Sequence, residues 1–305
     1  MKRLTLSCAS IALLAFPPAG FAADNLREDW NLRTRAGEEA PFQAYRPNYF
    51  LPARRTSQVN DAPSSPAPGR TVSPPEDLDS TEAKFQLSVK SQLWGGDSLF
   101  GGEWLGFDRF RLWFAYTQQS HWQSWNTARS SPFRESNYEP ELIATFGRAA
   151  VDSGFRLFNL GVALQSNGQS IPKSRSWRRV YGQLGFDLGN FSLLARLWRR
   201  TDRRGDADDN PGIEDYVGRG ELVLQYRARG HSAELLLRDN LKRDPNRGLA
   251  QLDWSMPWFW PFSSLNQGSS RFHLQASSGY GESLIDYNHR QATVGVGVSL
   301  GFGRR

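Results

Sequence analysis

The sequence predicts an all-β protein, a twelve-stranded antiparallel β-barrel that crosses a membrane. Many stretches alternate apolar with polar residues, and 11 Trp, 9 Tyr and 19 Phe accompany 28 Gly. A membrane barrel has this composition because its lumen is polar and only alternate residues meet lipid. The mean hydropathy of −0.57 and the 22% of charged residues also suit a soluble protein. A soluble β-sandwich is therefore the competing interpretation.

The first 22 residues have the features of a cleaved secretory signal peptide. Two basic residues precede an apolar run, Leu4 to Phe16, and a small-residue site ends at Ala22. The run is shorter than the roughly 20 residues that a membrane helix needs. The single cysteine, Cys8, lies within this segment. We therefore expect an exported protein without disulfides or thiol chemistry, which favours a bacterial outer-membrane barrel.

The rest of the chain divides into three expected parts. Residues 23–46 are polar and irregular, and we expect them in the periplasm. Residues 47–305 are expected to form the barrel. Within the barrel, residues 57–80 hold five prolines among Ser and Asp, a composition that builds no packed core. We therefore expect a mobile loop there.

Strand signals recur along the barrel region, separated by Gly, Asn, Asp and Pro. Twelve strands are expected, and an even number lets a meander close without edges. An aromatic cluster from Trp254 to Phe262 is typical of a girdle at the membrane boundary. The expected strands are Asn48–Arg54, one from Ala83, one around Phe110–Phe114, Glu141–Gly147, Phe155–Gln165, Trp177–Leu188, Phe191–Arg199, Tyr216–Tyr226, Ser232–Asp239, Leu249–Met256, Arg271–Ser278 and Ala292–Phe302.

Several short motifs resemble those of the outer-membrane phospholipase A family, and they occur in the family's order over nearly the whole exported chain. The central motif is Ser166-Asn167-Gly168. The others are Tyr116-Thr117-Gln118, residues 130–135, residues 137–140, residues 174–177, residues 208–211 and residues 278–288.

The resemblance implies a calcium-dependent acyl hydrolase that cleaves phospholipids and lysophospholipids at the outer wall of the barrel. It makes Ser166 the nucleophile and places Gln118 at the interface of an active homodimer. It also implies calcium ligands: the backbone oxygen of Gln169, the hydroxyl of Ser174, the backbone oxygen of Ser130 of the partner subunit and, at an additional calcium position, Asp209. Oxygen ligands suit this hard ion.

Two residues depart from the family pattern beside the nucleophile. Leu164 stands where the family has a histidine, and Arg178 stands where it has the asparagine that orients that histidine. Residues 164 and 166 of a strand point to the same face, so a base at 164 would reach the serine. Leucine accepts no proton, and a guanidinium stays protonated, so the sequence predicts an impaired nucleophile. Gln169 and Ile171 replace a basic and an acidic residue, which weakens the calcium positions.

Another base is conceivable among five side chains. We expect the His121 side chain on the opposite face of its strand from Gln118, and the His273 side chain in the lumen. The other two histidines are expected at a turn and near a hairpin. The lysine is expected in a loop, where its side chain is usually solvated. The five candidates are His121, His231, His273, His289 and Lys173. The sequence has no G-x-S-x-G elbow and no spaced Cys/His metal cluster.

The function predicted from sequence is a phospholipase A1/A2 of impaired activity, acting on membrane phospholipids. The alternative is a non-catalytic barrel with a structural or envelope role. A small-solute channel is less favoured, because a twelve-stranded lumen is narrow and long side chains fill it. The formal charge of +6 is spread along the chain, so no nucleic-acid partner is expected.

Overall fold

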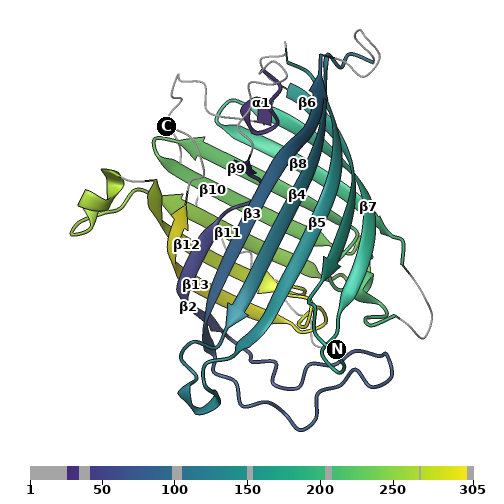
Figure 1. The fold of residues 1–305 in the computed structure, drawn as a ribbon, viewed down its shortest axis with the longest axis vertical. Helices are drawn as coiled ribbons and strands as arrows, with labels where there is room; N and C mark the ends of the chain where they lie inside the picture. The colour runs from purple at the N-terminus through teal and green to yellow at the C-terminus, as the bar shows by residue number, and fades with distance from the viewer. Residues whose placement is uncertain are drawn as a thin grey trace, which may run out of the picture.

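The barrel closes through twelve antiparallel strands, which confirms the predicted fold class. The computed structural model describes residues 26–33, 42–97, 105–149, 154–202, 208–267 and 269–300. Each strand from β2 to β13 pairs with the next, and β13 pairs back with β2 (Figure 1). In these ranges no helix is long and apolar enough to cross a membrane. The expected signal peptide with Cys8, and Phe302, lie outside the described residues.

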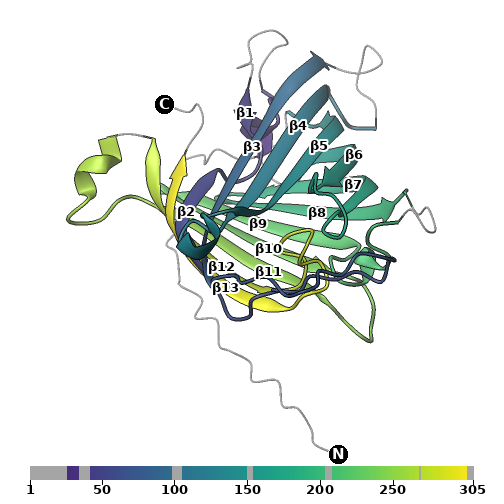
Figure 2. The ribbon, with the colours of Figure 1, turned by 60° about the horizontal axis from the view of Figure 1, so that its bottom comes forward.

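The strands have the following bounds: β2 Tyr49–Thr56, β3 Thr81–Gly96, β4 Arg109–Trp122, β5 Phe133–Gly147, β6 Gly154–Ser166, β7 Ser176–Leu188, β8 Phe191–Arg200, β9 Gly220–Ala228, β10 His231–Asp239, β11 Gly248–Met256, β12 Ser270–Gly279 and β13 Gln291–Leu300. A two-residue strand, β1 (Gln43–Ala44), pairs with β3. The turns after β7 and β9 take two residues each, and we call their side of the barrel the short-turn end. The loops after β2, β4, β6, β8, β10 and β12 lie at the opposite side, the long-loop end (Figure 2).

Strand β5 begins eight residues earlier than the sequence predicts, at Phe133 rather than Glu141. Proline cannot donate to a ladder, yet residues 133–140 belong to the strand. The structure keeps Pro140 in β5 opposite Tyr116 of β4. On the other side the ladder to β6 omits residues 139 and 140. Strand β9 in turn begins at Gly220, later than expected, because the 3-10 helix η3 (Ile213–Asp215) precedes it.

Alternate residues of the strands form an apolar outer wall. Leu160 of β6, Leu184 of β7 and Leu197 of β8 are all exposed, as are the leucines and valines at the same height on the neighbouring strands. Such a band is what a lipid-facing barrel surface requires. The opposite face of the same strands is buried and includes charged side chains. One face of the wall therefore contacts lipid, and the other faces the lumen.

The lumen is filled by paired charges near the long-loop end. Arg54 contacts the carboxylates of Glu82, at 2.7 Å, and of Glu282, and Arg134 contacts Glu82 at 3.0 Å and Asp286 at 2.8 Å. Buried charges persist only when they are paired. Burial opposes ionisation of Asp286, but the Arg134 guanidinium outweighs it, so the pKa of this carboxyl lies below its usual range.

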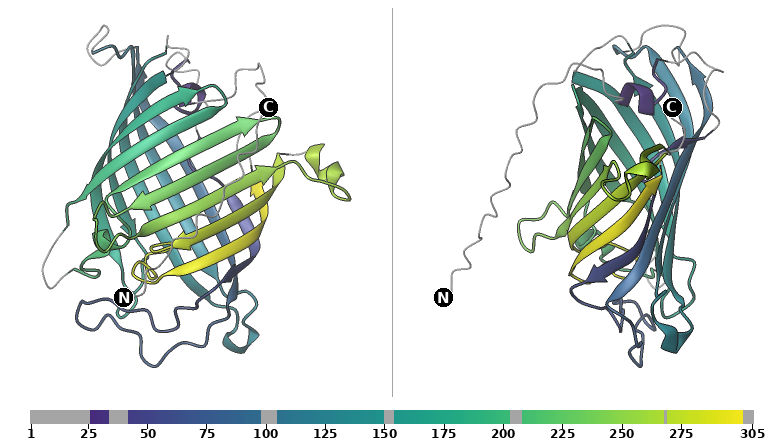
Figure 3. Two further views of the ribbon diagram at one scale, coloured as in Figure 1. Left: turned by 180° about the vertical axis from the view of Figure 1, so that it is seen from behind. Right: turned by 90° about the vertical axis from the view of Figure 1, so that its left-hand side faces the viewer.

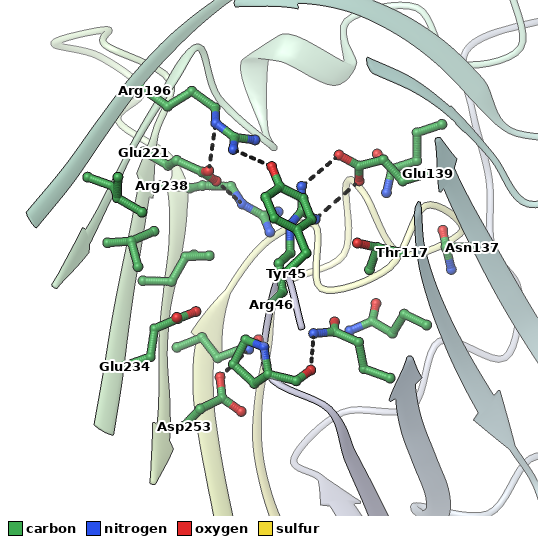
Figure 4. A pocket seen from close by; sticks show the side chains of 18 of the residues that line it. Tyr45, Arg46, Thr117, Asn137, Glu139, Arg196, Glu221, Glu234, Arg238 and Asp253 are labelled. Carbon is green, nitrogen blue, oxygen red and sulfur yellow. Dashed lines mark hydrogen bonds and ion pairs between the residues drawn. The ribbon is translucent and has the colours of Figure 1, made fainter. Parts of the chain in front are cut away.

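A small polar cavity of about 120 Å³ remains in the middle of the lumen. Figure 4 shows Arg46 reaching Glu139 on one side, and Arg196 between Tyr45 and Glu221 on the other. These charges belong to the inner face of the wall, while the predicted nucleophile belongs to the outer face.

The N-terminal residues 26–33, which we call the N-terminal plug, enter the short-turn end of the barrel (Figure 3). Helix α1 (Leu26–Asp29) donates the Leu26 N–H to Asp187 at 3.1 Å. Leu26, Trp30 and Leu32 are buried, and the Trp30 ring lies 5.9 Å from that of Trp113, edge to face. The sequence analysis expected an irregular segment here. The difference arises because three apolar side chains find a core inside the barrel.

The segment of residues 57–80 crosses the long-loop end (Figure 1). The expectation that it has nothing to bury is wrong, since Pro63, Ala67 and Val72 are buried. The Arg70 guanidinium also contacts Asp209 at 2.6 Å. Mobility of the segment stays a prediction. These contacts show at which residues the segment is attached to the rest of the protein.

Limited proteolysis tests that prediction. We expect proteinase K to cut the folded protein within residues 57–80 before it cuts any strand, because the prolines leave few backbone hydrogen bonds there. Arg70→Ala should accelerate the cut by removing the ion pair with Asp209. Arg243→Ala, at an exposed arginine of the loop after β10, is the matched control and should leave the rate unchanged. Cleavage that begins in the strands would contradict the prediction.

Candidate active site on the outer wall

Ser166 is the last residue of β6 and faces outward at the long-loop end. The register pairs Ser166 with Ser176, and Leu164 with Arg178, across β6 and β7. Leu164 is 44% exposed and Arg178 is exposed. As strand alternation predicts, Leu164 shares the outer face with Ser166. On the other side of β6, Tyr138 of β5 pairs with Ser166.

The Ser166 hydroxyl has no base beside it in the described structure. Its oxygen accepts one hydrogen bond, from the Gly168 N–H at 3.1 Å. Within the described ranges no side chain accepts the Ser166 proton, and Leu164 occupies the nearest outward position on the same strand. A serine hydroxyl without a base is a weak nucleophile at neutral pH.

The inner side of the same strand is held by polar contacts. Gln165 points into the lumen, where its Oε1 accepts from Trp177 Nε1 at 2.7 Å. Arg179, two residues beyond Trp177, donates to Glu139 at 2.8 Å. These bonds tie β5, β6 and β7 together behind the nucleophile. They hold the register that turns Ser166 outward.

Asn167 organises the loop that follows β6. Its side chain is buried, and its Nδ2 donates to Glu135 at 3.2 Å and to the Lys173 carbonyl at 2.8 Å. Its Oδ1 accepts from the N–H groups of Gln169, at 3.3 Å, and Arg175, at 2.9 Å. One side chain therefore closes the loop from beginning to end. Gly168 has φ +63°, a left-handed conformation that glycine adopts without strain.

The structure brings two of the predicted calcium ligands together. Ser174 Oγ donates to Asp209 Oδ2 at 2.8 Å, and Ser176 Oγ approaches the same oxygen at 3.5 Å. A carboxylate with two hydroxyls is an oxygen set that suits calcium. The other carboxylate oxygen, Oδ1, is bound by Arg70 at 2.6 Å. Among the residues that the structure describes, no three His, Cys, Asp or Glu side chains gather as a metal site.

Two further predicted ligands lie on different loops. Gln169 follows Ser166 in the loop after β6, and its side-chain amide donates to the Arg134 carbonyl at 3.1 Å. Ser130 caps the 3-10 helix η1 (Thr127–Arg129) in the loop after β4, and it is exposed. No contact joins Ser130 to Ser174 or Asp209 of the same chain. This separation is compatible with the expectation that Ser130 serves a partner subunit.

The five alternative bases have other contacts. His121 is buried in the lumen with its Nδ1 2.8 Å from Glu82, and His273 lies there with its Nε2 3.0 Å from Asp253. Both lumen predictions are confirmed. His231 begins β10 beside a two-residue turn, His289 contacts the Gln58 carbonyl, and Lys173 is paired with Glu76.

Sequence reasoning missed two residues that shape the site. Arg70 reaches Asp209 from the proline-rich segment, 139 residues away in sequence, and no local pattern announces such a contact. Asn167 was quoted only as part of the Ser-Asn-Gly motif. An asparagine before a glycine is a turn signal, and it could have indicated the role in loop closure.

Comparison with known proteins decides the family. The family model described as phospholipase A1 matches residues 26–300. The chain belongs to the phospholipase A1 family. It is 36% identical to phospholipase A1 of Salmonella typhimurium over 84% of this chain and 80% of that one. It is 38% identical to a putative phospholipase A1 of Neisseria meningitidis, over 83% of this chain but only 64% of the relative. Phospholipase A1 of Klebsiella pneumoniae is 34% identical, with 98% of each chain covered.

Solved structures agree with this family and place the barrel in the outer membrane. The outer membrane phospholipase A of Escherichia coli has a TM-score of 0.71 and 34% identity, with 88% of this chain and 95% of that one covered. A second structure of that protein is described as an active-site mutant in which an asparagine is replaced by alanine. The Salmonella typhi outer membrane phospholipase, described as a dimer with bound calcium, has a TM-score of 0.69 and 35% identity over 87% of this chain and 94% of that one.

Replacement of Asn167 tests the loop assignment. Asn167→Ala removes four hydrogen bonds of a buried side chain, each worth about 1 kcal/mol. We expect the temperature at which the folded band disappears in an unboiled gel to fall clearly. Asn246→Ala, which removes two side-chain bonds of an exposed loop asparagine, should leave it nearly unchanged. Equal shifts in the two variants would contradict the role of Asn167.

Proposed function

We propose that this barrel is a calcium-dependent phospholipase A of impaired activity. It would hydrolyse the acyl esters of phospholipids and lysophospholipids, at either glycerol position, with Ser166 as the nucleophile. The observation that carries the proposal is the outward row of Leu164, Ser166 and Arg178 at the edge of the lipid-facing wall. This row supports the proposal because it puts the proposed nucleophile on the face that lipids would contact, beside a leucine that offers no base.

The position of the site supports a membrane substrate. On the side of Ser166 that faces the short-turn end, the same outer face carries Leu164, Val162 and Val180, all exposed. Acyl chains of a lipid beside the barrel would contact these side chains, and the ester linkage would then lie near the serine. The polar lumen cavity is on the other side of the wall, so the substrate does not need to enter it.

The impaired activity follows from the lack of a group that accepts the proton of the Ser166 hydroxyl. For Ser166 to attack an ester, its proton must leave with the help of a group that accepts it. Leu164 has no such group, and the guanidinium of Arg178 is already protonated. The hydroxyl therefore attacks largely in its neutral form, and we infer a slow acylation step.

The oxygen set at the rim fits calcium. Ser174 would hold the ion through its hydroxyl, together with the backbone carbonyl of Gln169 and, in a homodimer, the backbone oxygen of Ser130 of the partner subunit. Asp209 would serve an additional calcium position. Bound calcium would polarise the ester carbonyl and stabilise the developing oxyanion. Ile171 cannot contribute a carboxylate, and Arg70 competes for Asp209, so we infer weak affinity.

The homodimer is part of the proposal. Gln118 of β4 pairs with Tyr138 of β5, and both lie on the outer face beside Ser166. The Gln118 amide contacts only the outward Tyr116 and Ser120, so it is available to a second barrel. We further propose that residues 1–22 are removed on export and that the segment of residues 23–46 faces the periplasm.

A non-catalytic barrel is the alternative that the same observation favours. If Leu164 and Arg178 have ended hydrolysis, the fold persists for a structural or envelope role. Such a protein would show the same barrel and the same loop after β6. The two proposals differ only in whether Ser166 still reacts.

Restoring the missing groups tests the site. Leu164→His with Arg178→Asn should raise phospholipid hydrolysis in mixed micelles well above the parent rate. General-base assistance contributes roughly 10²–10⁴-fold, and the asparagine keeps the imidazole oriented. Removing calcium with a chelator, or adding Ser166→Ala, should abolish the gain.

The matched control keeps Arg178 and removes another outward arginine. Leu164→His with Arg55→Asn changes the same residue types at an outward arginine of β2, so it should gain much less. If the restored double variant folds but hydrolyses no faster than the parent, the assignment of positions 164 and 178 is wrong.

A further inference from the structure

Arg178 and Arg199 are neighbours on the outer wall. Val180 of β7 pairs with Arg199 of β8, so Arg178 lies one diagonal step from Arg199, a separation of about 7–8 Å between backbone positions. Both side chains are exposed. With Arg55 of β2, they are the only Lys or Arg residues of the described strands that are exposed. Arg55 has no second arginine beside it, since its partners are Val294 and Thr81.

Neither guanidinium of the pair has a partner in the described part of the chain. The lumen arginines behave differently: Arg54, Arg134 and Arg179 each contact at least one carboxylate. A guanidinium at the edge of an apolar wall has lost part of its hydration. It therefore favours an anion that supplies both charge and hydrogen-bond acceptors.

The outer wall changes from polar to apolar side chains near Arg178 and Arg199. Toward the long-loop end, Ser166 and Ser176 present hydroxyls, and in the other direction Val180 and Leu197 present apolar side chains. A lipid molecule has the same sequence of chemistry, with a charged headgroup followed by acyl chains. Two planar guanidinium forks suit phosphate oxygens, which they bind in pairs of parallel hydrogen bonds.

We propose that Arg178 and Arg199 bind the phosphate of an anionic lipid whose acyl chains lie along the apolar wall beside them. The preferred headgroup carries a phosphate whose charge no amine of the same headgroup offsets. Lipid binding does not require the Ser166 hydroxyl to react, so the test of this site does not depend on the proposed hydrolysis. It also gives a reason for an arginine at position 178 once the orienting asparagine is no longer needed.

Binding of a lipid that cannot be hydrolysed tests the proposal. The probe is diether phosphatidic acid, added to the purified full chain in a non-ionic detergent and followed by native mass spectrometry. Arg178→Gln with Arg199→Gln should weaken binding at least about tenfold, because both phosphate contacts are lost. Each single change should weaken it several-fold. Arg55→Gln, which removes an outward arginine without a neighbour, should leave it within about twofold.

Two further arms identify the source of the phosphate. Diether phosphatidylcholine should bind the parent more weakly and should be less sensitive to the double change, because its headgroup cation offsets the phosphate. Inorganic phosphate should not displace the lipid at equal concentration, because it lacks the acyl chains. Displacement would show a free-anion site and overturn the lipid assignment.

Equal losses in the Arg55 control and the double variant would overturn the site, because general surface charge would then explain binding. Heat-modifiable migration in unboiled gels verifies the fold of every variant. If the double variant fails to fold, the singles decide: losses in both Arg178→Gln and Arg199→Gln support the site, and no loss in either overturns it.

Discussion

A closed ring of strands turns each residue of the described strands toward the lipid or toward the lumen. Because side chains alternate along a strand, Leu164 and Ser166 meet the membrane, whereas Gln165 and Asn167 meet the polar interior. Closure also forces charges such as Arg54 and Glu82 to satisfy one another inside. The proposed nucleophile is consequently on the outer face of the wall, and the contacts that hold its strand are on the inner face.

The support behind Ser166 is intact, although the chemistry beside it is not. Gln165 is bound by Trp177, and Asn167 closes the following loop through both atoms of its amide. Leu164 and Arg178, the two residues in question in the proposed site, both lie on the outer face. The contacts that hold the loop after β6 therefore do not involve position 164.

The alternation in the sequence was sufficient to predict that the strands exist and that Leu164, Ser166 and Arg178 form an outward row. Regular alternation from Phe155 to Gln165 and from Trp177 to Leu188 predicted β6 and β7, and with them the shared face of residues 164 and 166. The predicted start of β5 at Glu141 was too late, since Pro140 stays in the ladder to β4 although the ladder to β6 omits it. The N-terminal plug was missed because its few apolar residues have no period. The contact of Arg70 with Asp209 joins segments far apart in sequence, and only the fold brings them together.

The outer wall beside β7 and β8 links the two proposals. Arg178 cannot orient a base in the proposed active site, and with Arg199 it would form the proposed phosphate-binding pair at the lipid boundary. One residue therefore belongs to both proposals.

The central claim is that Ser166 sits in a phospholipase site that lacks its base. The most direct measurement is the initial rate of phospholipid hydrolysis in calcium-containing mixed micelles by the wild-type chain and by Ser166→Ala. The account predicts a slow or undetectable wild-type rate, and any measurable rate should vanish in the alanine variant. A fast wild-type rate that Ser166→Ala leaves unchanged would contradict it.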